Sequence, residues 1–351
     1  MSTVDELTTL IAADPQSQEI SLSSHRAYQA ATYIDLRLIV RMRRIGITPG
    51  EAAATEDRAA VSRPIDSADA EPSRIYRLRV PSSEIAVDTY PDVLAVLSDP
   101  RMQVPDAAAG DGAFLDFRRR VSRYSSGANH RERRELILAL LAGMDPDRLR
   151  QDAVAGTERL LAEGPIADRA KFEMHCARTI PVAVMGAALG FTEPADLAGP
   201  VSMMAGPYAS GTVSDPAEMD DAITALLGRA RGDHPVLRAQ LLLQTFTATA
   251  ALIGSVLASM PSEDIGATIR WVLEHRPPVA GTRRVATTSM LIGDHRFEPG
   301  ATALVNLRAR PAGGAGASLA FGSGPRACPA PAHAVAITHG VVAVLTASGR
   351  H

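Results

Sequence analysis

A cysteine near the carboxyl end of the chain has the neighbours that a reactive thiol needs. Cys328 closes the segment Phe321-Gly-Ser-Gly-Pro-Arg-Ala-Cys328, and an apolar run that predicts a helix follows from Ala330 to Leu345. Glycines such as Gly322 allow positive φ angles, so the backbone can turn tightly and approach a flat ligand. A helix start and Arg326 favour the thiolate over the thiol. We predict that Cys328 is a metal ligand; the alternative is a buried structural cysteine.

The spacing F-G-x-G-x-R-x-C resembles the cysteine loop of the cytochrome P450 superfamily. The chain looks like a divergent, shortened, soluble bacterial member. The resemblance implies haem b as cofactor, with Cys328 as iron ligand, Phe321 and Gly322 beside the cofactor, and Arg326 at a propionate. The glycine that the family carries two residues after the cysteine is replaced by Ala330.

Further cations match the family's propionate ligands, which are needed because unpaired carboxylates are costly to bury. His130 and Arg134 lie one helical turn apart and are similar to an H-x-x-x-R clamp. A solvated charged helix is the alternative for this pair. Arg284, six residues after Pro278, resembles the next propionate arginine. Together with Arg326, the resemblance implies four cofactor-binding cations.

The apolar stretch from Leu241 to Gly254 is similar to the family's distal helix, whose motif is A-G-x-[D/E]-T. Thr249 keeps the catalytic hydroxyl of that motif, although a helical threonine can also bond its own i−4 carbonyl. Ala248 replaces the acid and cannot act as a general acid. Phe246 replaces a small residue, so we expect Phe246 and Ala248 to line the substrate pocket.

A second departure concerns the buried E-x-x-R pair of the family, whose places hold Trp271 and Glu274. An inherited buried carboxylate without a cation is destabilised. We therefore predict a rebuilt pair with Arg276 or Arg283; the alternative is that Glu274 faces water. The stretch 308–318 is short compared with the family, and the family's last β segment is missing, which predicts a more open substrate site.

Hydrophobic periodicity predicts a mainly α fold with small sheets. We expect residues 1–74 to form a helix-rich N-terminal segment with a mobile linker, either part of the same domain or partly disordered, and residues 75–351 to form the P450-like domain. The expected elements are a hairpin of 75–80 with 84–88, a helix over 90–97, mostly helices from 129 to 345, and a β run with a turn over 289–300.

Composition limits the function classes. With 36 Lys and Arg against 39 Asp and Glu, no global basic field indicates nucleic acid. The N-terminus has no basic region followed by an apolar run, so we expect a cytoplasmic protein without a membrane anchor. Two cysteines make no disulfide scaffold, and Cys176 is expected to be a small core residue.

The resemblance implies a haem-thiolate enzyme that acts on a small molecule, with natural-product biosynthesis as the expected setting. Its chemistry would be an atypical oxidation: a monooxygenase reaction fed by ferredoxin and ferredoxin reductase, a peroxide-driven oxidation, or a non-oxygenating rearrangement. The alternative is a haem-free accessory protein of the same fold that binds and activates a partner enzyme such as a glycosyltransferase. Haem binding for sensing or storage is a third, minor reading.

Overall fold

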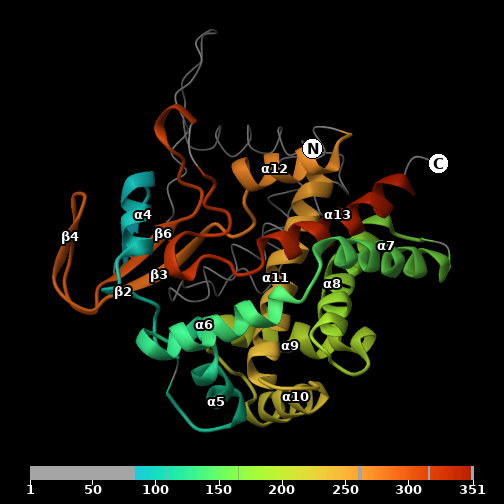
Figure 1. Cartoon of the computed structure of the whole chain (residues 1–351), viewed down its shortest axis with the longest axis horizontal. Coiled ribbons are helices and arrows are strands. Elements are labelled where there is room, and N and C mark those ends of the chain that lie inside the picture. The colour runs from blue at the N-terminus through green and yellow to red at the C-terminus, as the bar shows by residue number, and fades with distance from the viewer. Residues whose placement is uncertain (1–83, 108, 165, 260–262, 315–316, 349–351) are drawn as a thin grey trace, which may run out of the picture.

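A computed structural model describes residues 84–107, 109–164, 166–259, 263–314 and 317–348. These residues form a large helical part with a small sheet at one side (Figure 1). The mainly α architecture predicted from the sequence is confirmed. The predicted segment 1–74 and the first strand of the 75–88 hairpin lie outside the described residues.

Most predicted helices are present, and the helix over 90–97 is confirmed as α4. The helices are α4 (Tyr90–Ser98), α5 (Ala113–Arg120), α6 (Gly127–Ala142), α7 (Pro146–Ala162), α8 (Arg169–Ala188), α9 (Ala198–Ser210), α10 (Pro216–Arg229), α11 (Pro235–Ser259), α12 (Ile265–His275) and α13 (Pro331–Ala347). Short 3-10 turns include η2 (Ser122–Tyr124), η4 (Ala312–Gly314) and η5 (Gly324–Arg326). Several helices begin where local chemistry predicts: Asp215 and Asp264 accept backbone N–H groups of α10 and α12.

Four strands form the main sheet in the order β1-β6-β3-β2. Their bounds are β1 (Glu84–Val87), β2 (Met102–Gln103), β3 (Gly281–Ala286) and β6 (Thr302–Asn306). β1 runs parallel to β6, and the other pairings are antiparallel. The β run over 289–300 is confirmed as a hairpin of β4 (Met290–Ile292) and β5 (His295–Phe297), which turns at Gly293 with φ of 54°. β3 and β6 had no clear sequence signal.

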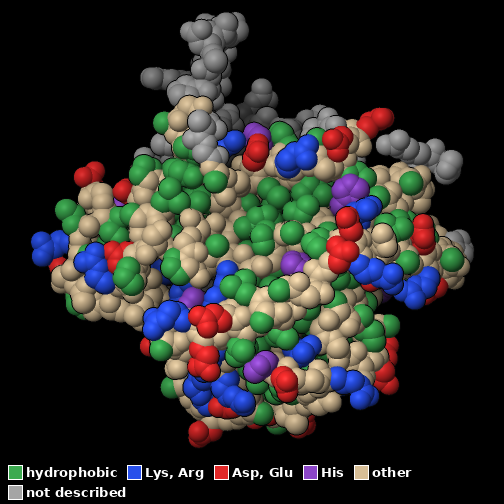
Figure 2. All heavy atoms as spheres, in the orientation of Figure 1, with side chains coloured by type: hydrophobic (Ala, Val, Ile, Leu, Met, Phe, Trp, Pro, Cys, Tyr) green, Lys and Arg blue, Asp and Glu red, His purple; other side chains and the backbone are tan. Residues whose placement is uncertain are grey.

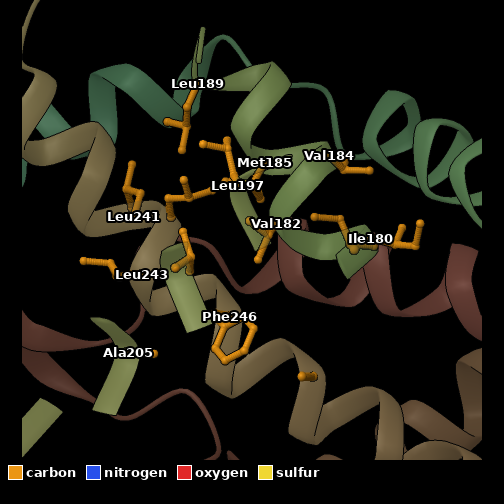
Figure 3. Close-up of a cluster of buried hydrophobic side chains, with 14 of the residues drawn as sticks. Ile180, Val182, Val184, Met185, Leu189, Leu197, Ala205, Leu241, Leu243 and Phe246 are labelled. Atoms are coloured by element: carbon orange, nitrogen blue, oxygen red, sulfur yellow. The ribbon is translucent and has the colours of Figure 1, made fainter. Parts of the chain in front are cut away.

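The core surrounds α11, which packs against α8, α9, α12 and α13. Figure 3 shows side chains of α8, such as Val182 and Met185, in one cluster with Leu241 and Phe246 of α11. By length and composition α11 could cross a membrane, but most of its apolar window is buried inside the protein. A second cluster lies between the sheet and α4. It supports the chain segment that leads into the cysteine loop.

Candidate functional site

The cysteine loop folds back on itself in a tight double turn. The backbone N–H of Cys328 donates to the carbonyl of Phe321 at 2.7 Å, and that of Gly322 donates to Leu319 at 2.8 Å. Gly322 and Gly324 have φ angles of 72° and 69°, which lie in the left-handed region that glycine tolerates best. The predicted need for glycine at both positions is confirmed, and α13 begins three residues after the cysteine.

The loop is pressed against the end of α4. A Cβ atom added to Gly324 would lie 2.8 Å from the carbonyl oxygen of Leu97. No side chain fits there without a shift of the backbone. α4 therefore sets the position of η5, and through η5 that of Arg326 and Cys328.

The thiol of Cys328 is half-buried beside the start of α13. The backbone N–H of Ala330 donates to its sulfur at 3.4 Å. Burial raises the pKa of Cys328, while the Ala330 hydrogen bond and the charge of Arg134 oppose that rise without cancelling it. The prediction that a helix start and Arg326 hold a thiolate is therefore wrong for this structure, because the desolvation of the sulfur outweighs the nearby positive charge.

His130 lies where the predicted cations converge. Its side chain is buried on α6, and its pKa is lowered to about 4 by burial and then by the positive charges of Arg326, Arg134, Arg284 and Arg131. These charges come from α6, β3 and the cysteine loop. The four cations predicted from separated parts of the sequence thus lie within electrostatic range of one point.

Hydrogen bonds hold the two cations from outside α6. Arg326 donates to the carbonyl of Ser125 at 2.6 Å and to the hydroxyl of Ser126 at 3.3 Å. Arg284, which is 5% exposed, donates to the hydroxyl of Thr282 at 3.1 Å and to the carbonyl of Arg283 at 2.8 Å. All these bonds end on neutral oxygen atoms, so they fix the side chains without neutralising their charge.

The threonines of α11 differ in their hydrogen bonds. Thr245 donates to the carbonyl of Leu241 at 2.9 Å. Thr249 is buried, and within the described ranges its hydroxyl makes no such bond to the i−4 carbonyl. Ala248, at the place of the family's acid, is half-buried. The catalytic role of Thr249 stays a prediction.

Phe246 belongs to the helix core. Its side chain is 5% exposed, and its ring lies in the cluster between α11 and α8 shown in Figure 3. The guanidinium carbon of Arg178 lies 5.9 Å from the ring centroid. The packing of Phe246 is thus that of a core residue, and the pocket role of Phe246 and Ala248 stays a prediction.

The prediction of a rebuilt buried pair for Glu274 is wrong. Glu274 is exposed at the end of α12. Trp271 instead stacks on His275, with ring centroids 4.9 Å apart. Arg283 pairs with Glu84 of β1 at 2.6 Å. Glu274 faces water because its helix turns the flat Trp271–His275 stack, and not the carboxylate, towards its neighbours.

Sequence reasoning missed Ser125 and Ser126, which anchor Arg326, and Glu84, which partners Arg283. None of these positions carries a motif, since their roles arise from contacts between distant segments. On the face shown in Figure 2, basic and acidic side chains are interspersed around a largely hydrophobic centre near α12 and α13. This agrees with the near-neutral net charge of the chain.

A scan of protein-family models gave no match, and neither did a search of curated proteins. The fold, in contrast, is similar to that of solved cytochromes P450. P450BioI, in complex with acyl carrier protein ligated to hexadec-9Z-enoic acid, has a TM-score of 0.60 at 13% identity, over 75% of this chain and 84% of that one. The thermophilic cytochrome P450 from Sulfolobus tokodaii has a TM-score of 0.58 at 15% identity, over 78% and 88%.

A mutant of P450 EryK in complex with erythromycin B has a TM-score of 0.56 at 18% identity, over 75% of this chain and 82% of that chain. Similarity at these identities shows the fold alone. The chain therefore has the cytochrome P450 fold, as its cysteine loop predicted.

Proposed function

We propose that this protein is a haem-thiolate enzyme that acts on a small molecule. Cys328 would be the iron ligand, and His130, Arg134, Arg284 and Arg326 would hold the two haem propionates. The observation that carries the proposal is the convergence of these cations around a half-buried thiol. Like charges at short range repel each other, so such a cluster is best stabilised by anionic groups placed among them.

The donor set fits haem b. Three guanidinium groups face a cofactor that brings two carboxylates, and Arg134 lies close enough to the sulfur to oppose the rise in the Cys328 pKa. A metal bound at the sulfur replaces the thiol proton. Gly322, with its positive φ, leaves the loop without a side chain on that face.

Bound haem supplies the redox chemistry, while the protein supplies binding, orientation and proton control. Cys328 donates its sulfur, which the Ala330 N–H tunes through a hydrogen bond. Thr249 offers a buried hydroxyl on α11. Ala248 has no proton to give. We therefore propose a reaction that needs no proton relay from this helix: a peroxide-driven oxidation or a non-oxygenating rearrangement.

The substrate class proposed is a small organic molecule of natural-product biosynthesis. One structural neighbour was crystallised with erythromycin B, and another with an acyl chain on a carrier protein. Both support an organic substrate, either free or presented by a protein. A ferredoxin system is the partner expected if the enzyme works as an ordinary monooxygenase.

The visible spectrum tests the cofactor. Purified protein is offered hemin, reduced and treated with carbon monoxide. A thiolate ligand gives a red-shifted band, and a neutral thiol or histidine gives a blue-shifted band. Cys328→Ala should abolish the red-shifted band, and Cys176→Ala, which removes the fully buried thiol of α8, should leave it unchanged. A colourless protein, or a band that survives Cys328→Ala, would refute the proposal.

The oxidant is tested on the haem-loaded protein with guaiacol as a general electron donor. Turnover with hydrogen peroxide should exceed oxygen consumption driven by ferredoxin and its reductase. Ala248→Asp, which restores an acid at this place, should shift the balance towards the reductase. A clear preference of the unchanged protein for the reductase would contradict the peroxide assignment but leave haem binding intact.

A second candidate is a haem-free accessory protein that activates a partner enzyme such as a glycosyltransferase. The exposed Glu274 favours it, because the buried Glu-Arg pair of haem-binding relatives has no counterpart at this place. So does the raised pKa of Cys328. A protein that stays colourless with hemin and forms a complex with its partner enzyme during gel filtration would support this candidate over the first.

A further inference from the structure

A buried guanidinium lies far from the cysteine loop in sequence, on α5. Arg118 is 3% exposed. Its Nε donates to the carbonyl oxygen of Tyr208 on α9 at 3.0 Å, and its guanidinium carbon lies 4.3 Å from the ring centroid of Tyr124. Its Nη1 is fully buried and has no hydrogen-bond partner in the described part of the chain. One end of this cation is therefore unsatisfied, which costs free energy in a buried site.

The hydroxyl of Tyr208 is unsatisfied in the same cluster. Tyr208 is 3% exposed, and among the described residues its hydroxyl has no hydrogen-bond partner. Burial raises the pKa of Tyr208, followed by Tyr124, while Arg123 and Arg118 oppose the rise. The hydroxyl therefore keeps its proton and can donate it. The rings of Phe117 and Tyr124 lie 5.9 Å and 5.6 Å from that of Tyr208.

The nearby carboxylates are engaged elsewhere. Asp220 of α10 accepts the backbone N–H of Phe114 at 2.8 Å, at the start of α5. Asp116 pairs with Arg119 and Arg120 on the exposed side of the helix. Neither neutralises Arg118. A Cβ atom at Gly211 would lie 2.5 Å from Nη1, so this glycine lets the chain cover the guanidinium closely.

We propose that the cluster of Arg118, Tyr124 and Tyr208 binds the carboxylate of a small organic acid. Arg118 Nη1 and the Tyr208 hydroxyl would donate to its oxygens, and the aromatic rings would contact its apolar body. One buried cation balances one negative charge, whereas a phosphate dianion would leave a second charge unpaired. Arg123 and Ala209 are exposed beside the cluster, so the site adjoins the surface where α5 and α9 meet.

This site does not depend on haem, so its test uses the full chain without added hemin. Thermal unfolding is followed with sodium benzoate, sodium chloride and sodium phosphate at matched ionic strength. Benzoate should raise the midpoint in a saturable way, and chloride should not. An equal response to benzoate and chloride would mean that only water occupies the site, and it would overturn the proposal. A larger response to phosphate would overturn the carboxylate assignment.

The variant that decides is Tyr208→Phe. It removes a buried hydroxyl that has no partner among the described residues, so the protein without ligand should be as stable as the original or more so. Its apparent affinity for benzoate should nevertheless fall about tenfold, the loss of one hydrogen bond to a charged group. An unchanged benzoate response would overturn the role of Tyr208, because lost stability could not be the reason.

Arg118→Met keeps the apolar stem and should abolish the benzoate response. Arg238→Met is the matched control. Arg238 also joins two segments through backbone carbonyls, those of Asp233 at 2.7 Å and Leu189 at 2.6 Å. Its loss should lower the unfolding midpoint but leave the benzoate shift intact. If both variants lose the shift together, the shift reports general stability and the proposal fails.

Discussion

The guanidinium of Arg326 donates a hydrogen bond to the backbone carbonyl of Ser125, 201 residues earlier in the chain, at 2.6 Å. This bond joins the cysteine loop to the turn just before α6, the helix that carries His130 and Arg134. The distance between the thiol and those cations thus depends on one side chain. Arg326 serves as a structural tie in this state and as a proposed propionate ligand.

Arg326→Ala should weaken both roles. The loss of a hydrogen bond from a buried cation costs about 1.5–3 kcal/mol, so hemin affinity should fall by about tenfold or more. The measurement is an absorbance titration with hemin, together with urea unfolding. Arg296→Ala is the control, because Arg296 is 80% exposed and pairs only with Glu298 at the surface. Equal hemin affinity of both variants would contradict the assignment of Arg326.

Gly324→Ala should destabilise the cysteine loop through a steric clash. A positive φ alone costs alanine about 1 kcal/mol. The contact of 2.8 Å with the Leu97 carbonyl adds to that cost at Gly324. Gly300→Ala is the matched control, since Gly300 also has a positive φ, 86°, but its added Cβ would meet nothing within 4 Å.

Urea unfolding of the two glycine variants measures the difference. Gly324→Ala should lose about 1–2 kcal/mol more than Gly300→Ala, and it should bind hemin more weakly. Equal losses would show that α4 yields to the loop instead of positioning it.

His130 predicts an acid-dependent loss of stability. Its pKa is about 4 in the folded protein against 6.5 normally, so the unfolded chain binds the proton first as the pH falls. Stability from the neutral imidazole is complete above pH 6.5 and is lost towards pH 4, by on the order of 3 kcal/mol. Unfolding curves of the original protein and of His130→Gln should diverge over this range.

Bound haem should reverse part of this effect. Propionates beside His130 favour its charged form and raise its pKa, so the loss of stability on acidification should become smaller. The same unfolding curves with and without hemin measure the change. A pH dependence identical in both would mean that no carboxylate approaches His130.

The buried pair of Arg283 and Glu84 should be sensitive to the removal of one partner. The side chains are 14% and 7% exposed, respectively. Glu84→Gln leaves a buried cation without its counter-charge and should cost about 3 kcal/mol. The double variant with Glu84→Leu and Arg283→Met should recover much of this loss. A double variant that loses the sum of both single effects would argue against the pairing.

Glu274→Ala should change stability by less than about 0.5 kcal/mol, because the side chain is exposed. Urea unfolding checks this. Trp271→Ala in the same helix should cost more, since it removes the stack on His275. A large loss for Glu274→Ala would reveal a buried partner for this carboxylate.

Local features could be predicted from the sequence by itself. The glycine turns at Gly322 and Gly324, the helix that follows Cys328 and the β4–β5 hairpin depend on backbone preferences over a few residues. The same holds for Cys176 as a core residue. The family resemblance of the cysteine loop also predicted the fold, because that loop is a contiguous pattern.

Only the tertiary structure decided how distant segments meet. It brought Arg284 and Arg326 to His130, paired β3 with β6, and turned Glu274 to water. It also decided that burial outweighs positive charge at the Cys328 sulfur, and it left Arg118 and Tyr208 with unsatisfied polar atoms. Burial and electrostatics depend on what packs around a group, and that packing joins residues hundreds of positions apart.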